Sequence, residues 1–238
     1  MYTLEDLKAK LNEINKMGYI KTHRSGPTGI GKTLEDLLGI TENNISNSDL
    51  EDLGELKSCR NNQLSMVTLF TKSPSPPKVN TTLLETYGYY DPNRRGRKIL
   101  HTTINGINYN SINGKPYGFK VEIEGDRLYL KTNFPKKVDA YWEKDDLKKS
   151  FERKLPKLIF VKANSRGVGR NEEFHFVEAY QLEGFSFEKF VDLITNGIIK
   201  IDIRIGQYPD GRTHDHGTAF RVINNYIDEL FDKKIRLL

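Results

Sequence analysis

Two carboxylates and one lysine lie close together after residue 48, and their types suit hydrolysis of phosphodiester bonds. Glu55 and Lys57 are two residues apart, so they project from the same side of an extended strand. Asp49 adds a second carboxylate to that side if the chain bends before Glu55, which Gly54 permits because glycine adopts turn and bulge conformations freely. Two hard oxygen ligands beside an ammonium group are the residue types of a Mg²⁺ site that hydrolyses phosphodiesters.

Two helices are expected near this segment. Residues 2–17 predict the first helix, because Thr3 can cap it and leucine and isoleucine recur at helical spacing. Residues 32–38 predict the second, which ends at Gly39. This second helix carries Glu35 one turn from its start, where the carboxylate either joins the two described above or is an ordinary solvated group.

The rest of the chain alternates strand and helix patterns, which predicts a mixed α/β or α+β fold. The residues FKVEIEG and RLYLKTNF alternate apolar and polar side chains across a Gly-Asp turn, which is typical of a hairpin. Residues 157–163, KLIFVKA, form a continuous apolar run of the kind found in buried strands. Further strands are predicted at 66–71, 174–182 and 198–208, and further helices at 145–154, 187–195 and about 226–231.

The segment GPTGIGKT, residues 26–33, fits the phosphate-binding loop pattern of nucleotide hydrolases. A loop of that kind follows a buried parallel strand, whereas the preceding residues IKTHRS are polar and charged. No later apolar strand of suitable length ends in the aspartate that such hydrolases use for Mg²⁺. A P-loop NTPase is therefore kept only as an alternative, and a glycine-rich helix entry that approaches a DNA backbone is preferred.

A second polar segment, THDHGTAFR at residues 213–221, has side chains that suit the reading of DNA bases. Arginine donates a pair of hydrogen bonds to guanine, aspartate accepts from cytosine, and histidine can do either. Two histidines alone make a poor zinc site, because no third ligand of matching type lies nearby. A polar surface loop is the alternative. The candidate DNA-binding residues are Arg212, His214, Asp215, His216 and Arg221, together with Asp202 and Arg204 on one face of the preceding strand.

Composition restricts the class of protein without deciding its function. Lys and Arg number 37 against 32 Asp and Glu, and the sequence pI is about 9.0, which favours a polyanionic partner only weakly. Cys59 is the single cysteine, so a disulfide framework is excluded and a reducing compartment is expected. No stretch reaches membrane-spanning length, and the first residues lack the uninterrupted apolar core of a signal peptide.

Several of these blocks together resemble the MvaI/BcnI type of restriction endonuclease, and within that type the MvaI branch. They are TGIGKTLEDLLG, the acidic and lysine pattern from Asp49 to Lys57, TLFTKSP, and IDIRIG followed by THDHGTAFR, and they run from about residue 20 to 222. The resemblance implies a MutH-like PD-(D/E)xK nuclease: a central mixed sheet flanked by helices, with two lobes around a DNA cleft. It places residues 1–82 and about 155–197 in the catalytic lobe, and about 83–154 and 198–238 in the recognition lobe.

The resemblance also implies roles for the residues identified above. Glu55 and Lys57 match the ExK pair, Glu35 matches the helix carboxylate of the MutH-like group, and Asp49 is the first metal ligand together with Glu55. Ser48 stands where the family has proline, which leaves Asp52 as a rival for Asp49. Mg²⁺ is the expected cofactor, with Mn²⁺ as a substitute and Ca²⁺ supporting binding without cleavage.

The expected activity is type II cleavage of double-stranded DNA at a CCNGG-type pseudopalindrome, with CCWGG as the first choice. The resemblance implies a monomer that nicks each strand in turn and leaves 5′-phosphate ends. A cognate DNA methyltransferase is expected as a genetic partner in a bacterial or archaeal cytoplasm, with neither a stable protein partner nor a membrane. A MutH-like strand-directed nickase and a non-catalytic DNA-binding module remain alternatives beside the NTPase.

Overall fold

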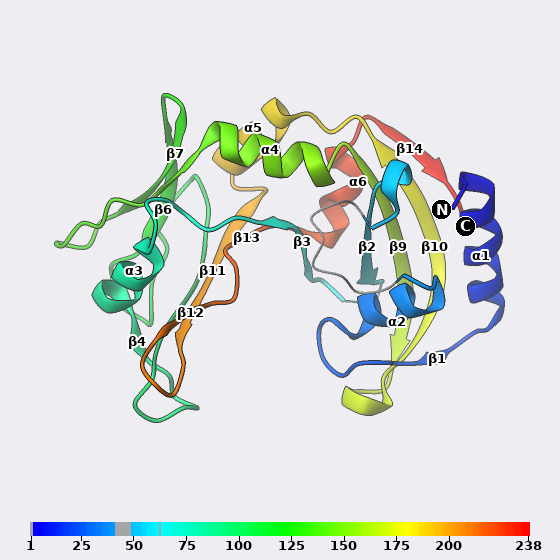
Figure 1. Ribbon diagram of the computed structural model, residues 1–238, viewed down its shortest axis with the longest axis horizontal. Helices are drawn as coiled ribbons and strands as arrows, with labels where there is room; N and C mark the ends of the chain where they lie inside the picture. The colour runs from blue at the N-terminus through cyan, green and yellow to red at the C-terminus, as the bar shows by residue number, and fades with distance from the viewer. Residues whose placement is uncertain (1, 41–48, 62) are drawn as a thin grey trace. The chain divides into compact units, whose positions relative to one another are not determined.

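The computed structural model describes residues 2–40, 49–61 and 63–238, and its helices and strands divide between two units (Figure 1). Unit 1 is built from three segments of the chain, Met1–Val67, Glu152–Ser186 and Ile223–Leu238. Unit 2 is built from the two segments between them, Thr68–Phe151 and Phe187–Val222. The mixed α/β class predicted from the sequence is confirmed.

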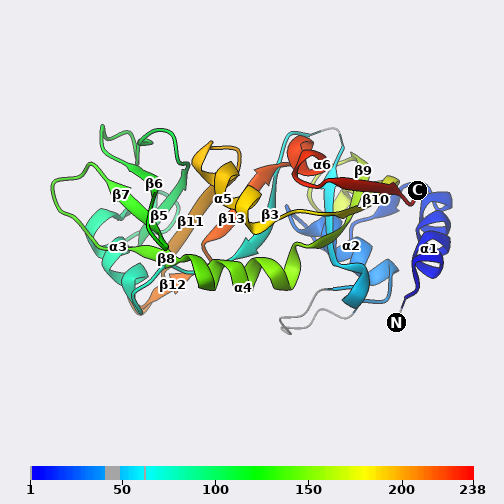
Figure 2. The same cartoon turned by 90° about the horizontal axis from the view of Figure 1, so that it is seen from above.

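Unit 1 contains a sheet whose central strand pair follows from the apolar run at residues 157–163. Leu158, Ile159, Phe160 and Val161 have no exposed surface, because both faces of their strand are covered. This strand runs parallel to the strand that begins at Glu55, and all the other pairings of the sheet are antiparallel. The order is β1 (Ile20–Lys21), β10 (Glu173–Glu183), β9 (Lys157–Arg166) and β2 (Glu55–Arg60), and β14 (Lys233–Arg236) also pairs with β10 (Figure 1). The neighbouring strands β9 and β10 are also labelled in Figure 2.

Two helices pack on this sheet, and both were expected from the sequence. In α1 (Leu4–Lys16) the backbone N–H of Asp6 donates to Thr3 Oγ1 at 3.1 Å, which forms the N-terminal cap. The helix α2 (Gly29–Leu37) starts three residues before its predicted start, 29 against 32. Gly29 is the first residue of this helix. A Cβ at that position would lie only 2.2 Å from the carbonyl oxygen of Arg24, so the glycine allows the helix to pack closely against the preceding loop.

Unit 2 is organised around aromatic side chains between its sheets and helices. The rings of Phe70 and Phe220 are 4.9 Å apart, and Phe190 lies 5.6 Å and Trp142 5.9 Å from Phe220. The larger sheet has the order β3 (Met66–Thr71), β13 (Ala219–Ile223), β11 (Lys200–Gln207), β5 (Lys98–Ile104) and β4 (Tyr89–Tyr90), with β12 (Thr213–Asp215) paired to β11. The smaller sheet is β6 (Phe119–Glu124), β7 (Arg127–Thr132) and β8 (Tyr141–Glu143), and the helices are α3 (Val79–Tyr87), α5 (Phe187–Thr195) and most of α4 (Lys144–Lys154). The end of α4, from Glu152, belongs to unit 1.

The hairpin predicted in unit 2 is confirmed in its register. Glu124 pairs with Arg127, so Gly125 and Asp126 form a two-residue turn, and Gly125 adopts the positive φ of 57° that such a turn needs. None of the helices in the described part of the chain has both the length and the apolar character that a membrane-spanning helix requires.

The end of the chain differs from the prediction. In place of a helix over residues 226–231, the structure has a single turn, α6 (Ile227–Leu230), followed by the strand β14. The pairing of β14 with β10 accompanies the assignment of residues 223–238 to unit 1, whereas the sequence analysis grouped them with the recognition segments. Residues 68–82 lie in unit 2, where β3 pairs with β13.

A tight turn before β2 returns the chain to the start of that strand. A short 3-10 helix at Glu51–Leu53 leads to Gly54, whose φ is +112°, and the N–H of Leu50 donates to the carbonyl oxygen of Gly54 at 3.1 Å. A Cβ on Gly54 would lie 2.4 Å from the carbonyl oxygen of Lys157. Only glycine fits this position, because it combines a left-handed conformation with contact to the backbone of β9.

We expect Gly54→Ala to lower the free energy of unfolding by roughly 2 kcal/mol or more, from backbone strain together with overpacking. Gly18→Ala is the matched control, because Gly18 also has a positive φ, of 69°, but a Cβ there would meet no atom within 4 Å. Gly18→Ala is expected to lower the free energy of unfolding by about 1 kcal/mol. Urea titrations of the three proteins measure the difference, and equal losses at the two positions would contradict the role given to Gly54.

Candidate functional site

The carboxylate of Glu55 is the most enclosed group of the candidate active site in unit 1. Glu55 is the first residue of β2, and its side chain is only 2% exposed. Its Oε1 accepts hydrogen bonds from Lys57 Nζ at 2.7 Å and from Lys154 Nζ at 2.9 Å. Its Oε2 is buried, and no hydrogen-bond partner reaches it in the described part of the chain. One oxygen is therefore fully used, and the other is left for a ligand that the chain does not supply.

Asp49 lies beside Glu55 because of the turn at Gly54. Its Oδ2 accepts a hydrogen bond from the backbone N–H of Leu56 at 3.1 Å. Asp49 is an exposed residue, but partial desolvation of its carboxyl group raises its pKa; repulsion from the Glu55 carboxylate raises the pKa further, and Lys57 opposes the change. The charge of Glu55 therefore acts on Asp49, as expected of two carboxylates placed to share a cation.

The rival carboxylate, Asp52, is placed differently. It lines a shallow pocket of about 230 Å³ with Arg153 and Lys157. The backbone carbonyl oxygen of Asp52 accepts a hydrogen bond from Lys157 Nζ at 3.3 Å. Asp49 is instead the aspartate whose side chain binds the start of β2, through the N–H of Leu56.

Glu35 projects from α2 toward β2. A Cβ built on Gly31 would lie 3.9 Å from Glu35 Oε1 and 3.8 Å from Ser58 Oγ, so the carboxylate and the strand approach the same point. The neighbouring Asp36 is instead occupied at the surface, since it pairs with Lys32 at 2.7 Å and those contacts lower its pKa. On α2, the half-buried carboxylate of Glu35 therefore faces the sheet, whereas the carboxylate of Asp36 is exposed.

The carboxylates of Asp49 and Glu55 fit a divalent cation. Within residues 2–40, 49–61 and 63–238 there is no group of three His, Cys, Asp or Glu side chains that could form a complete cage. Magnesium does not need such a cage, because it is usually held by one or two carboxylates together with water and substrate phosphate oxygens. The buried, unpartnered Oε2 of Glu55 beside Asp49 matches that requirement.

The GPTGIGKT segment does not have the structure of a phosphate-binding loop. The strand before it, β1, has only two residues and pairs antiparallel with β10. Thr33 Oγ1 donates to the carbonyl oxygen of Gly29 at 2.8 Å, so the hydroxyl is used inside α2. Two carbonyl oxygens of the loop, those of Gly26 and Pro27, accept hydrogen bonds from Arg60 at 3.3 Å. The structure therefore gives no support to the NTPase alternative.

Arg60 itself belongs to an ion pair that the sequence did not suggest. Its Nε and Nη2 donate to the two oxygens of Glu172 at 2.6 and 2.8 Å, and both side chains are largely buried. This bidentate pair joins the end of β2 to the segment before β10 and holds the glycine-rich loop against the strand. No local pattern reveals it, because the partners are 112 residues apart.

In unit 2 the buried carboxylate of Asp202 pairs with two arginines. Its side chain has no exposed surface; Oδ1 accepts from Thr103 Oγ1 at 2.9 Å. Its Oδ2 accepts from Arg204 Nε at 3.0 Å and pairs with Arg221 Nη1 at 2.8 Å. Every oxygen of Asp202 is already used, so it orients the two guanidinium groups. The buried Nε of Arg221 has no hydrogen-bond partner among the described residues.

Asp215 is likewise engaged inside unit 2. Its Oδ2 accepts hydrogen bonds from Ser73 Oγ at 2.7 Å and Asn80 Nδ2 at 2.6 Å. Its Oδ1 accepts from the N–H of Gly217 at 2.8 Å. These three donors fix the start of the loop that carries His216.

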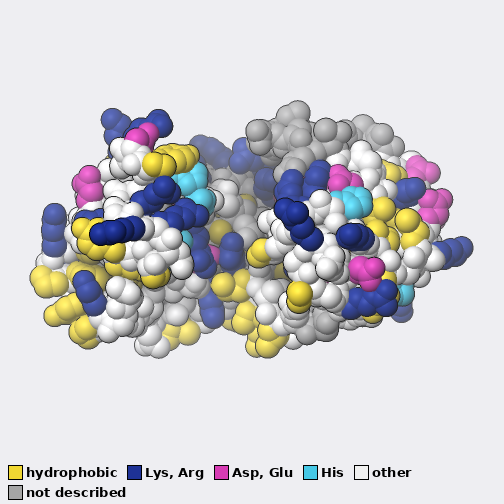
Figure 3. Space-filling model, turned by 90° about the horizontal axis from the view of Figure 1, so that it is seen from below, with side chains coloured by type: hydrophobic (Ala, Val, Ile, Leu, Met, Phe, Trp, Pro, Cys, Tyr) yellow, Lys and Arg dark blue, Asp and Glu magenta, His cyan; other side chains and the backbone are white. Residues whose placement is uncertain are grey.

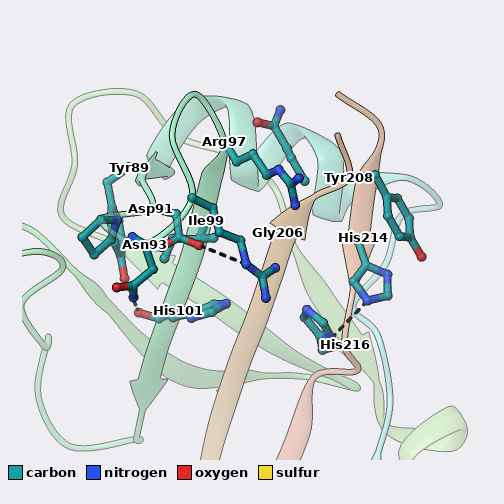
Figure 4. Close-up of a pocket in the computed structure, with 13 residues that line it drawn as sticks. Tyr89, Asp91, Asn93, Arg97, Ile99, His101, Gly206, Tyr208, His214 and His216 are labelled. Carbon is teal, nitrogen blue, oxygen red and sulfur yellow. Dashed lines mark hydrogen bonds and ion pairs between the residues drawn. The ribbon is translucent and has the colours of Figure 1, made fainter. Parts of the chain in front are cut away.

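His214 and His216 line a pocket of about 530 Å³ in unit 2 (Figure 4). A ring nitrogen of one lies 3.1 Å from a ring nitrogen of the other, and the ring of Tyr208 is 4.5 Å from that of His214. Arg212 lies at the exposed tip and pairs with Asp210 at 2.7 Å. Other lining residues, which the sequence did not single out as base readers, include Tyr89, Asp91, Arg94, Arg97 and His101.

The pocket joins two loops that carry basic side chains. Arg94 and Arg97 line the pocket together with the histidine pair. Burial lowers the pKa of both His101 and His216, and nearby cationic side chains lower it further. Their rings are therefore neutral at neutral pH, where each presents one donor and one acceptor. In Figure 3 histidine side chains lie close to Lys and Arg side chains on unit 2.

The comparisons with known proteins agree with the geometry of both units. The model of the MvaI/BcnI restriction endonuclease family matches residues 8–231. A solved complex of restriction endonuclease MvaI with its cognate DNA substrate is 32% identical with a TM-score of 0.87, and the match covers 100% of both chains. MvaI in the absence of DNA is 31% identical with a TM-score of 0.60, covering 100% of this chain and 99% of that one. None of the curated proteins compared with the chain matches it.

The raised pKa of Asp49 predicts how its replacement changes stability with pH. Ionisation of a carboxyl whose folded-state pKa is raised opposes folding, so the penalty is absent at acidic pH and develops as pH rises through the raised pKa. We expect Asp49→Asn to increase the free energy of unfolding at about pH 7 without metal. The gain should shrink as the pH falls toward the ordinary value of 3.8. Urea titrations in the presence of a chelator measure it.

Glu55→Gln is the matched variant for this measurement. It removes a buried charge that two lysines neutralise, so it is expected to lower stability at about pH 7 where Asp49→Asn raises it. A loss of stability in Asp49→Asn at that pH would show that the Asp49 carboxylate is not destabilised by its surroundings.

Proposed function

Because the chain belongs to the MvaI/BcnI restriction endonuclease family and is therefore a type II sequence-specific DNA endonuclease, we propose that Asp49, Glu55 and Lys57 carry out the cleavage. The observation that carries the proposal is the buried Glu55 carboxylate, which has one oxygen paired with lysine and the other unpartnered, and whose charge acts on Asp49. Unit 1 is then the catalytic unit, and unit 2, with its arginines and histidines, reads the DNA sequence.

A divalent metal ion, which restriction endonucleases generally use, fits this site. We propose Mg²⁺, with Mn²⁺ able to replace it and Ca²⁺ supporting binding alone, and Asp49 with Glu55 Oε2 as the ligands. When bound, the ion neutralises charge on the scissile phosphate and lowers the pKa of the attacking water. Lys57 orients that water or offsets the developing negative charge, and Glu35 adds a third carboxylate on the α2 side. The products carry 5′-phosphates.

Base reading is assigned to the polar side chains of unit 2. The guanidinium groups of Arg204 and Arg221 are oriented by Asp202, and an oriented guanidinium can donate two hydrogen bonds to a guanine. His216, whose lowered pKa keeps its ring neutral, contributes one donor and one acceptor, His214 lies beside it, and Arg212 contacts phosphate from the tip of the loop. The match to an MvaI complex with cognate DNA supports a DNA-facing role for these residues. By the resemblance we place the site in the CCNGG class, with CCWGG first.

The proposed enzyme acts as a monomer that nicks the two strands in turn. It works in the cytoplasm of a bacterium or archaeon whose own DNA is protected by a cognate methyltransferase. A MutH-like nickase that cuts only one strand is the second candidate, because MutH-like nucleases share the same carboxylate and lysine set.

Digestion of supercoiled plasmid in Mg²⁺ tests the proposed function. We expect a fixed set of fragments whose ends map to CCWGG sequences. Persistent nicked circles would favour the nickase, and plasmid that stays supercoiled under all metal conditions would contradict both candidates.

Lys57→Ala is expected to lower the rate of cleavage by about 100-fold or more, because the group that acts on the attacking water is lost. Specific binding in Ca²⁺, measured by gel shift, should remain close to that of the unchanged protein. Lys8→Ala, which removes a lysine paired with Glu5 on α1, is the control for loss of one positive charge. Retained cleavage would remove Lys57 from the mechanism.

Arg221→Ala is expected to weaken binding to the cognate site by ~1 to 3 kcal/mol, the usual cost of one lost base contact. Arg221→Lys should lose most of the same discrimination, since an ammonium cannot reproduce the paired guanidinium donors. Arg212→Ala is expected to weaken binding to cognate and random DNA alike. Competition assays with both DNAs measure these effects, and an equal loss on random DNA with Arg221→Ala would assign Arg221 to the phosphate backbone.

A further inference from the structure

A second lysine contacts the same oxygen of Glu55 as Lys57 does. Lys154 is the last residue of α4, and its Nζ lies 2.9 Å from Glu55 Oε1. The two lysine side chains are similarly enclosed, at 26% exposed for Lys154 and 23% for Lys57. Two ammonium groups therefore share one oxygen of the buried Glu55 carboxylate.

The position of Lys154 is fixed by the elements on either side of it. The next residue, Leu155, has no exposed surface, and Leu158, which pairs with Glu55 across the β9 and β2 strands, is also fully buried. The ammonium group lies at the C-terminal end of α4, where the helix dipole favours a positive charge. The backbone of Lys154 is thus held in place, with its ammonium group at Glu55 Oε1.

This arrangement resolves a conflict between two roles of Lys57. In the resting protein Lys57 neutralises a carboxylate that is 2% exposed, whereas in the proposed reaction it acts on the attacking water. If Lys57 were the only partner, its departure would leave the buried Oε1 without a hydrogen bond, which is costly for a charged group. With Lys154 in place, Oε1 keeps a charged donor throughout.

We propose that Lys154 is a positioning residue of the active site, which holds Glu55 by Oε1 so that Lys57 can leave that oxygen for the attacking water. The proposal rests on the cleavage reaction proposed above. It divides the work of the two lysines: Lys154 keeps the buried carboxylate neutralised, and Lys57 acts on the reacting atoms.

A set of stability measurements without metal tests the shared carboxylate. Lys57→Met and Lys154→Met are each expected to shift the urea midpoint only slightly, because the other lysine still pairs with Glu55. The double variant should lose more than the sum of the two shifts, since it leaves the buried charge unpaired. Adding Glu55→Gln to the double variant should restore much of the loss. Additive shifts would overturn the proposal.

Single-turnover cleavage of cognate DNA tests the division of work. Lys154→Met is expected to slow cleavage by roughly 10- to 100-fold, the usual effect of losing a group that orients a metal ligand. Binding of cognate DNA in Ca²⁺ should be unchanged. Lys154→Arg should recover most of the rate, because it keeps a charged N–H donor for Oε1. A wild-type rate in Lys154→Met, or weakened DNA binding that accounts for the slower rate, would overturn the proposal.

Lys149→Met is the control variant, because Lys149 lies on the same helix and pairs with Asp146 at 3.6 Å on the surface. Its cleavage rate is expected to equal that of the unchanged protein. If the unchanged protein cuts no DNA, the proposed function fails, and the stability measurements still decide whether Lys154 shares Glu55 with Lys57.

Discussion

The candidate active site depends on one constraint, the neutralisation of a carboxylate inside the protein. Glu55 is 2% exposed, and an ionised carboxylate in that position is tolerated only when charged donors reach it. Lysines from β2 and α4 pair with one of its oxygens, and the turn at Gly54 returns Asp49 to the start of β2, where its Oδ2 accepts from the N–H of Leu56. The parallel pairing of β2 with β9 keeps these parts together, because it ties Glu55 to the strand that follows α4.

Unit 2 also contains a buried carboxylate that pairs with two cationic side chains. Asp202 is fully buried and pairs with two arginines by one oxygen, as Glu55 pairs with two lysines. The choice of cation fits the task, since the planar guanidinium groups stay fixed in orientation while an ammonium group can turn toward more than one partner. A buried carboxylate thus organises cationic groups in both units, for chemistry in one and for recognition in the other.

Much of the fold was predictable, because local patterns and final structure agree. The capped helix α1, the hairpin of β6 and β7, and the buried strand β9 each have periodicity or turn residues that identify them. Asp49, Glu55 and Lys57 could be proposed as site residues from the sequence because they lie within nine residues of chain. Contacts between distant segments could not be predicted in this way. Lys154 reaches Glu55 across 99 residues, and nothing in the pattern of α4 distinguishes it from the other lysines of that helix.

The pairing of β14 with β10 has a consequence for the order of synthesis. One edge of β10 is occupied by β9, and in the described part of the chain residues Tyr180–Glu183 pair on the other edge with residues 233–236. During translation that part of the edge has no strand partner until the chain has been made to residue 236, and an open strand edge can pair with other chains. Before β14 is made, Glu183 places a negative charge on this edge, and Lys233 pairs with that charge at 3.2 Å once the two strands meet.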